Sequence, residues 1–101
     1  MMHMKIHSTG SRFNNRFVIA VCDENLIGKT LKDGKISITI SKRFYKGEKK
    51  TEKEIIAVLK DATNINFVGK ESVAAGIKAG IITKSNIIKI KGVPHAQAVS
   101  S

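Results

Sequence analysis

Several side chains that bind phosphate or stack on bases fall close together in the middle of the sequence. They are Lys42, Arg43, Tyr45, Lys46, Lys49 and Lys50, and the basic run continues to Lys53. Mobile cations bind phosphate, and an exposed aromatic ring can stack on a nucleobase. This segment therefore predicts a nucleic-acid-binding loop. The alternative is that Phe44 anchors a strand end in the core while the basic side chains are simply solvated.

The C-terminal third adds a second basic segment. No Asp or Glu follows Glu71, whereas Lys89 and Lys91 alternate with Ile88 and Ile90. Alternate residues of a strand share a face, so a strand here would present both lysines together. Such a face would suit a phosphate backbone, and a solvated sheet face is the alternative.

The third group is the segment from Gly92 to Gln97, in which Pro94 restricts the backbone. His95 and Gln97 lie two residues apart and project to one side if the segment is extended. His95 could move a proton, bind a ligand or stack on an RNA base. Alternatively, the segment forms a structural corner in which the histidine binds backbone. We include His95 and Gln97 in the predicted RNA-binding set.

Four residues are candidates for catalysis, although we assign none of them this role. Cys22 and Asp23 follow an apolar run, and sites often lie at such strand ends in α/β proteins. A thiol nucleophile needs a base, which His95 could supply. Asp23, Lys29 and His95 together could instead serve a small enzyme. Nothing in the sequence brings these side chains together, so a buried and inert cysteine is the favoured interpretation.

Nucleotide, metal and cofactor sites are not predicted. Residues 28–30 are Gly-Lys-Thr, the end of a phosphate-binding loop, but that motif requires glycine where this chain has Asp23. The single cysteine, Cys22, excludes an internal disulfide and a cysteine-based zinc site. His3 and His7 have no clear partner ligands in the sequence. We therefore expect no metal and no cofactor.

The composition predicts a single domain over residues 1–101. A chain of this length with 42% hydrophobic residues can bury one core but not two. Eighteen Lys and Arg against eight Asp and Glu give a net charge of +10, which attracts polyanions. No apolar stretch is long enough for a membrane span, and the N-terminus lacks the apolar part of a signal peptide. We expect a cytoplasmic protein with no membrane partner.

The elements that must position these residues follow from the apolar pattern. Extended segments are expected over 4–9, 17–22, 35–41, 64–68 and 87–91, and the run 17–22 is typical of a central strand. Gly and Asn near residues 10–15 indicate a turn. Thr51 and Glu54 match a capping box that begins a helix ending near Ala62. Gly69 begins a second helix, narrow at residues 74–76, with Gly80 as its C-cap.

This order of elements predicts an α+β fold. Strands come first, and two helices follow with short strands between them. The pattern suits a two-layer α-β sandwich, in which a small mixed sheet carries two helices on one face.

Four blocks of the sequence resemble an archaeal family. Residues 21–24 (Val-Cys-Asp-Glu) and 26–30 (Leu-Ile-Gly-Lys-Thr) are similar to the N-terminal block of domain of unknown function family 424. Residues 66–70 (Asn-Phe-Val-Gly-Lys) resemble its central block, and residues 92–97 (Gly-Val-Pro-His-Ala-Gln) its C-terminal signature. The resemblance covers about residues 17–99. It implies archaeal origin, an α-β sandwich, no established activity, and genes that lie among those of translation and ribosome biogenesis.

The charge and the resemblance together predict a basic accessory RNA-binding protein of the translation machinery. We expect it to associate with the ribosome through ribosomal RNA, with ribosomal proteins or ribosome-biogenesis factors as further partners. One alternative is a small enzyme acting on RNA or another phosphate-bearing substrate. The other is a protein-interaction adaptor that uses an exposed apolar corner at Val93, Pro94 and His95.

Overall fold

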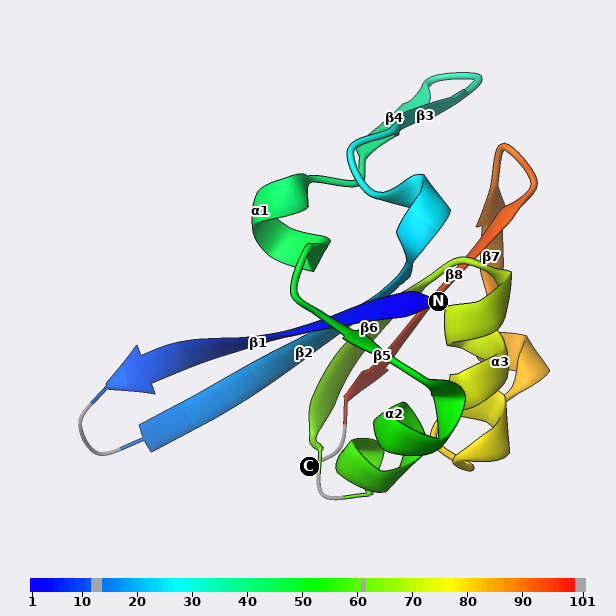
Figure 1. Cartoon of the computed structure of the whole chain (residues 1–101). Helices are drawn as coiled ribbons and strands as arrows, with labels where there is room; N and C mark the ends of the chain where they lie inside the picture. The colour runs from blue at the N-terminus through cyan, green and yellow to red at the C-terminus, as the bar shows by residue number, and fades with distance from the viewer. Residues whose placement is uncertain (12–13, 61, 100–101) are drawn as a thin grey trace.

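The computed structural model describes residues 1–11, 14–60 and 62–99 (Figure 1). The strands are β1 (Met2–Ser11), β2 (Asn14–Asp23), β3 (Thr30–Asp33), β4 (Ile36–Thr39), β5 (Glu48–Lys50), β6 (Asn64–Val68), β7 (Ile88–Ile90) and β8 (Val93–Val99). The helices are α1 (Lys42–Tyr45), α2 (Glu52–Leu59) and α3 (Lys70–Lys78), and the 3-10 turns are η1 (Glu24–Leu26) and η2 (Lys84–Asn86). None of the helices in these ranges is long and apolar enough to cross a membrane.

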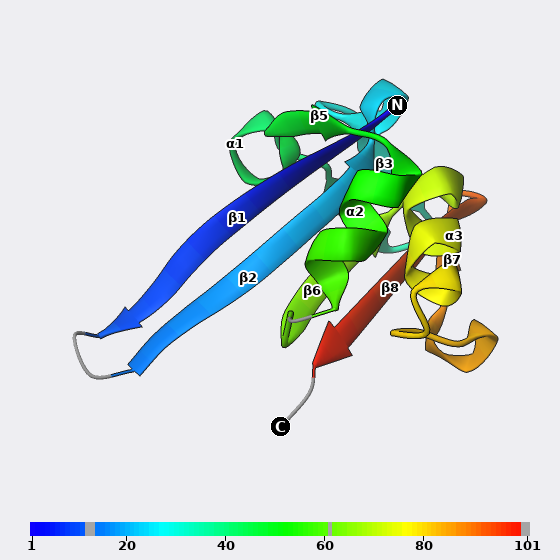
Figure 2. The same cartoon turned by 60° about the horizontal axis from the view of Figure 1, so that its bottom comes forward.

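Six of the described strands form one mixed sheet in the order β5-β1-β2-β6-β8-β7. β2 and β6 are parallel, and the other neighbours are antiparallel. Figure 2 shows α2 and α3 together on one face of this sheet, with α1 on the other side. The predicted α+β class and the predicted pair of helices on one face are confirmed.

The main core fills the space between the sheet and these two helices. Phe67 of β6 is fully buried there, together with Ile55 and Leu59 of α2. A Cβ added at Gly76 of α3 would lie 2.9 Å from the Phe67 ring. The missing side chain therefore lets α3 approach the sheet closely, as the small residues of this helix predicted.

A second layer covers part of the opposite face of the sheet. Leu26, Leu31 and Ile40 from the segment 24–47 pack there against Cys22 of β2 and Val68 of β6. The apolar run 17–22 predicted a strand covered on both faces, but not that the segment 24–47 supplies the second cover. This cover explains why Cys22 has no exposed surface, because the carboxyl end of β2 is buried on both faces.

Local signals at the helix ends were predicted well. The Thr51 hydroxyl accepts from the Glu54 N–H at 3.3 Å, and the Glu54 carboxylate accepts from the Thr51 N–H at 3.1 Å. This is the predicted capping box. Gly69 precedes α3 with φ of 107°, and Gly80 follows it with φ of 74°, both conformations that favour glycine.

Several boundaries in the middle of the chain were predicted wrongly. The first long helix ends at Leu59, short of Ala62. Residues 42–45 are helical rather than part of a loop, because the Ser41 hydroxyl accepts from the Phe44 N–H and caps a helical turn. The strand expected over 35–41 is β4, which pairs with β3 in a separate hairpin where Ile36 is 55% exposed.

The predicted final strand over 87–91 is also corrected. β7 ends at Ile90, and Lys91 and Gly92 form a turn with φ of 54° and 77°. The chain then returns as β8, whose Pro94 lies within the strand, opposite Lys89. Lys91 therefore does not share a strand face with Lys89, although the alternation of lysine and isoleucine predicted this.

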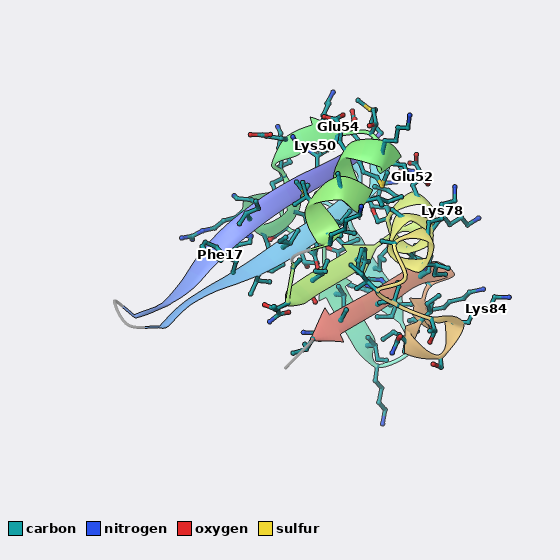
Figure 3. All side chains as sticks on the ribbon, turned by 90° about the horizontal axis from the view of Figure 1, so that it is seen from below. Phe17, Lys50, Glu52, Glu54, Lys78 and Lys84 are labelled. Atoms are coloured by element: carbon teal, nitrogen blue, oxygen red, sulfur yellow. The ribbon has the colours of Figure 1, made fainter. Side chains whose placement is uncertain are left out.

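The long hairpin of β1 and β2 extends away from the rest of the molecule (Figures 1 and 2). Phe17 of β2 lies on this arm and is 52% exposed (Figure 3). The predicted central strand is thus covered on both faces at Cys22 but open at Phe17. The turn expected near residues 10–15 includes residues 12 and 13, which lie outside the described ranges.

Candidate nucleic-acid interface

Helix α1 is held on the sheet by the side chains of β1. His3, Lys5 and His7 alternate along β1 and share a face of the sheet. The His7 ring stacks on the Phe44 ring with centroids 4.4 Å apart, and His7 Nε2 lies 2.8 Å from the Phe44 carbonyl oxygen. Lys5 donates to the Arg43 carbonyl.

The end of the α1 segment is held in the same way. The Nδ1 atom of His3 lies 3.0 Å from the Gly47 carbonyl oxygen. His3 and His7 are therefore structural residues that bind backbone. In the described ranges, no three His, Cys, Asp or Glu side chains lie close enough together to hold a metal ion.

A cationic pocket lies on the β1 and β5 side of α1. We define it by His3, Glu24, Ile27, Lys42, Lys46 and Lys49, and its volume is about 280 Å³. Lys49 Nζ lies 3.2 Å from Glu24 Oε1. This hydrogen bond lowers the pKa of the Glu24 carboxyl, so the carboxylate stays charged and holds Lys49 at the pocket.

The other predicted cations of this segment lie outside the pocket. Lys50 pairs with Glu48 at 3.1 Å and lies 4.0 Å from Glu54 (Figure 3). Lys50 is thus engaged by the carboxylates of β5 and α2 and turned away from the cationic pocket. Arg43 is exposed on α1, whereas Lys53 is exposed on α2 in the helical layer and not in a loop with the others.

A second, neutral pocket lies on the β6 and β8 side of α1. We define it by Tyr45, Asn66, Asn86, Ile88, His95 and Gln97, and its volume is also about 280 Å³. Asn66 of β6 is the register partner of Gln97 on β8, and His95 is the partner of Ile88 on β7. Partners in register share a face, so these side chains lie on the sheet face opposite α2 and α3.

Among the described residues, no charged side chain lines the neutral pocket. Burial lowers the pKa of His95 below its ordinary value of 6.5, which keeps the imidazole neutral at pH 7. Burial also raises the pKa of the Tyr45 phenol. His95 Nε2 is buried and has no hydrogen-bond partner among the described residues. The pocket therefore offers neutral donors and acceptors, together with one aromatic ring.

The charges are distributed unevenly between the two sides of the sheet. The segment 24–47, which forms the second layer, has six Lys or Arg and two acidic residues. The helical segment 48–78 has six Lys and five acidic residues. Ion pairs neutralise part of that segment, for example Lys78 with Glu52 at 2.8 Å (Figure 3). Of these two segments, the one that forms the second layer on the α1 side therefore carries the larger net charge, +4 against +1.

Of the two C-terminal lysines predicted to bind RNA, only Lys91 lies near the second layer. The Lys91 N–H donates to Asp33 Oδ2 at 2.9 Å and ties the β7–β8 turn to the β3–β4 hairpin. Figure 1 shows these two hairpins beside each other. The Lys91 backbone therefore lies beside the hairpin that carries Lys32 and Lys35. Lys89 pairs with Pro94 and lies on the opposite face of the sheet from His95.

Asp23 is buried at the start of α3, where it binds backbone. Its Oδ1 accepts from the Ser72 N–H at 2.8 Å and from the Ser72 hydroxyl at 2.7 Å, and its Oδ2 accepts from the Glu71 N–H at 3.1 Å. These bonds satisfy free N–H groups of the first helical turn. Both oxygens of the Asp23 carboxylate therefore accept hydrogen bonds from α3, and the residue as a whole is only 5% exposed.

The other catalytic candidates are not brought together with Asp23. Cys22 and His95 lie in one row across the sheet, but Val68 of β6 lies between them. Asp23 follows Cys22 in β2 and so points to the opposite face. Burial raises the pKa of the Cys22 thiol to about 12. Lys29 is exposed in the turn before β3.

Sequence reasoning missed Asn66, Asn86 and Ile88 as residues of the neutral pocket. Asn64 and Asn66 alternate with Ile65 and Phe67, which places both amides on one face of β6. That alternation was a usable signal. Asn86 has no such pattern, because η2 reaches the pocket only through the fold.

Comparisons with known proteins identify relatives without an established activity. A family model described as "Protein of unknown function (DUF424)" matches residues 12–100. A crystal structure of an uncharacterized conserved protein from Methanopyrus kandleri is 30% identical, covers 95% of this chain and 88% of its own, and has a TM-score of 0.77. No curated protein matches. The chain therefore belongs to the family of proteins of unknown function DUF424.

Proposed function

We propose that this protein is a basic accessory protein that binds RNA, with ribosomal RNA as its partner. The observation that supports this proposal most is the excess of cations in the second layer, beside a helical layer whose charges nearly balance. Phosphate neutralisation by Lys and Arg releases counterions from a nucleic acid and supplies most of the affinity of such contacts.

The cationic pocket gives this excess charge a defined location. Neither Lys42 nor Lys46 forms an ion pair with a carboxylate of the described residues. A phosphate entering the pocket can therefore bind both ammonium groups without breaking an existing pair. Lys49 would exchange Glu24 for the phosphate, or bind both.

The proposal extends to the translation machinery. The family resemblance associates such chains with genes of translation and ribosome biogenesis, and ribosomal RNA offers a dense phosphate surface. We propose a ribosome-associated protein of the archaeal cytoplasm, and ribosomal proteins or biogenesis factors would then be its neighbours.

No specific observation favours the two alternatives. An enzyme would need free functional groups, but Asp23 is occupied by α3 and Cys22 is buried with a raised pKa. An adaptor was expected to expose an apolar corner at residues 93–95, but Pro94 is buried.

A native pull-down tests the proposed function. Tagged protein is recovered from archaeal lysate with and without nuclease, and the RNA is sequenced. The comparison uses Lys42→Gln/Lys46→Gln and, as a control with the same loss of charge, Lys53→Gln/Lys60→Gln on the helical side. We expect ribosomal RNA with the wild type and the control, and much less with the first variant. Equal recovery from both variants, or partners that persist after nuclease, would contradict the proposal.

A further inference from the structure

We infer that the neutral pocket binds one unpaired nucleobase of an RNA strand whose phosphates lie in the cationic pocket. This inference rests on the proposed function. It adds that the neutral pocket binds the base of a nucleotide, whereas the cationic pocket binds phosphate. The two pockets flank α1, which contributes Lys42 to one and Tyr45 to the other. An RNA strand that crosses α1 can therefore place its phosphates on one side of the helix and a base on the other.

The lining of the neutral pocket suits a base and not a phosphate. Phosphate sites require cations or several N–H donors, whereas the polar side chains here are two sheet amides, one further amide, a neutral imidazole and a phenol. Each amide presents a donor and an acceptor, the combination that matches the edge of a base. Asn66 and Gln97 lie side by side on neighbouring strands, so both amides can face the same ligand.

The aromatic wall of this pocket is held in place from behind. Tyr45 meets Phe44 edge to face, with centroids 4.9 Å apart and an angle of 77° between the rings. Phe44 in turn stacks on His7 of β1. The orientation of the Tyr45 ring is thus fixed before a ligand arrives, which reduces the ordering cost of stacking a base against it.

His95 supports the same inference. Its Nε2 is buried without a partner among the described residues, and such an atom normally costs stability. No hydrogen bond of this nitrogen within the described ranges explains why a histidine occupies the position. A role toward a ligand in the pocket that its ring lines would explain it.

The pocket requires an unpaired base. In an RNA duplex the Watson–Crick edges are already paired and the bases stack on each other, so no base is free to enter a pocket. The inference therefore predicts that single strands bind better than duplexes of equal length. It also predicts that an abasic strand, which keeps the phosphates and loses the bases, binds worse.

Binding measurements on three probes test this inference. The probes are a single-stranded RNA of roughly ten nucleotides, an abasic strand of that length and a duplex, each measured by anisotropy. We expect the single strand to bind roughly fivefold or more tightly than the abasic strand. Quenching of Tyr45 fluorescence should accompany binding of the base-bearing strand, since the chain has one Tyr and no Trp.

Two pocket variants and one charge variant complete the design. The pocket variants are Gln97→Ala, at an exposed position, and Tyr45→Leu. Each should lower the affinity for single-stranded RNA until it approaches the affinity for the abasic strand. The affinity for the abasic strand itself should not change. If Tyr45→Leu does not fold, Gln97→Ala still decides. Lys42→Gln/Lys46→Gln should weaken the binding of single-stranded and abasic RNA by the same factor.

Equal affinity for single-stranded and abasic RNA, or tighter binding of the duplex, would overturn the base pocket while leaving RNA binding intact. Failure of every probe to bind at low salt would overturn the proposed function itself.

Discussion

Asp23 at the end of β2 and Ser72 in the first turn of α3 are joined by two hydrogen bonds, of 2.8 and 2.7 Å, to one carboxylate oxygen. The second oxygen binds the Glu71 N–H. This relationship connects a strand end to a helix start far along the sequence. It gives Asp23 a structural role at a strand end where the sequence made it one of four candidates for catalysis.

Replacing Asp23 with Ala should destabilise the fold substantially. The change leaves the Glu71 and Ser72 N–H groups and the Ser72 hydroxyl without their acceptor, and we expect a loss of about 2–4 kcal/mol in the free energy of unfolding. Chemical denaturation measures it. Glu48→Ala, whose side chain is 80% exposed and pairs only with Lys50 at the surface, is the control and should cost less than about 1 kcal/mol. Similar losses for both variants would refute the structural assignment of Asp23.

Gly69 should be equally sensitive, for a different reason. A Cβ there would lie 2.3 Å from the Asp23 carboxyl carbon, and φ is 107°. Gly69→Ala must therefore displace the carboxylate from α3, at a cost of more than about 2 kcal/mol. Gly34→Ala has a positive φ of 62° but open space around the added methyl, and should cost about 1 kcal/mol. Thermal melting of the two variants decides, and matching melting temperatures would exclude the predicted clash.

The local parts of this fold could be predicted from the sequence. Residues 17–22 indicated a buried strand, Thr51 with Glu54 indicated a helix start, and Gly80 indicated a helix end, because each signal acts over a few residues. The helical turn at α1 was missed because His7 and Lys5 of β1 help to hold it. Such contacts across the chain have no local signature.

Cys22 should resist alkylation in the folded protein. Its side chain is fully buried, and burial raises the thiol pKa to about 12, so thiolate is scarce near pH 8. We expect iodoacetamide to react at least about a hundredfold more slowly than with the protein unfolded in guanidinium. Mass spectrometry of timed samples measures both rates. Rapid modification of the folded chain would instead restore the thiol as a candidate nucleophile.

His95 should make the fold less stable in mild acid. Burial lowers its pKa in the folded state below the 6.5 expected when unfolded. Well above pH 6.5, His95 is neutral in the folded and in the unfolded chain, so it adds no pH dependence to the free energy of unfolding. As the pH falls below 6.5, the unfolded chain binds a proton that the folded chain does not, so folding loses free energy.

The variant His95→Gln isolates this effect, since both proteins keep His3 and His7 and differ only at residue 95. Between about pH 7 and pH 5, the difference in unfolding free energy should shift in favour of the variant. Denaturant titrations at several pH values measure the difference. A difference independent of pH would show that His95 has an ordinary pKa in the fold.

The candidate site was predictable only as a list of residues. The cluster 42–50 indicated phosphate chemistry, yet the structure divides it among the cationic pocket, the neutral pocket and the ion pairs of Lys50. His95 and Gln97 do project to one side, as predicted, because β8 is extended. Their meeting with Tyr45 depends on how the second layer packs over β2, which no spacing in the sequence encodes.

The salt dependence of RNA binding tests the central claim most directly. The logarithm of the association constant falls with the logarithm of salt concentration by roughly 0.7 per phosphate contact to a single strand. Lys42→Gln/Lys46→Gln should therefore reduce the slope by roughly one to two, while Lys53→Gln/Lys60→Gln leaves it unchanged. If both variants keep the wild-type slope, or both lose it equally, the α1 side of the sheet is not where phosphate binds.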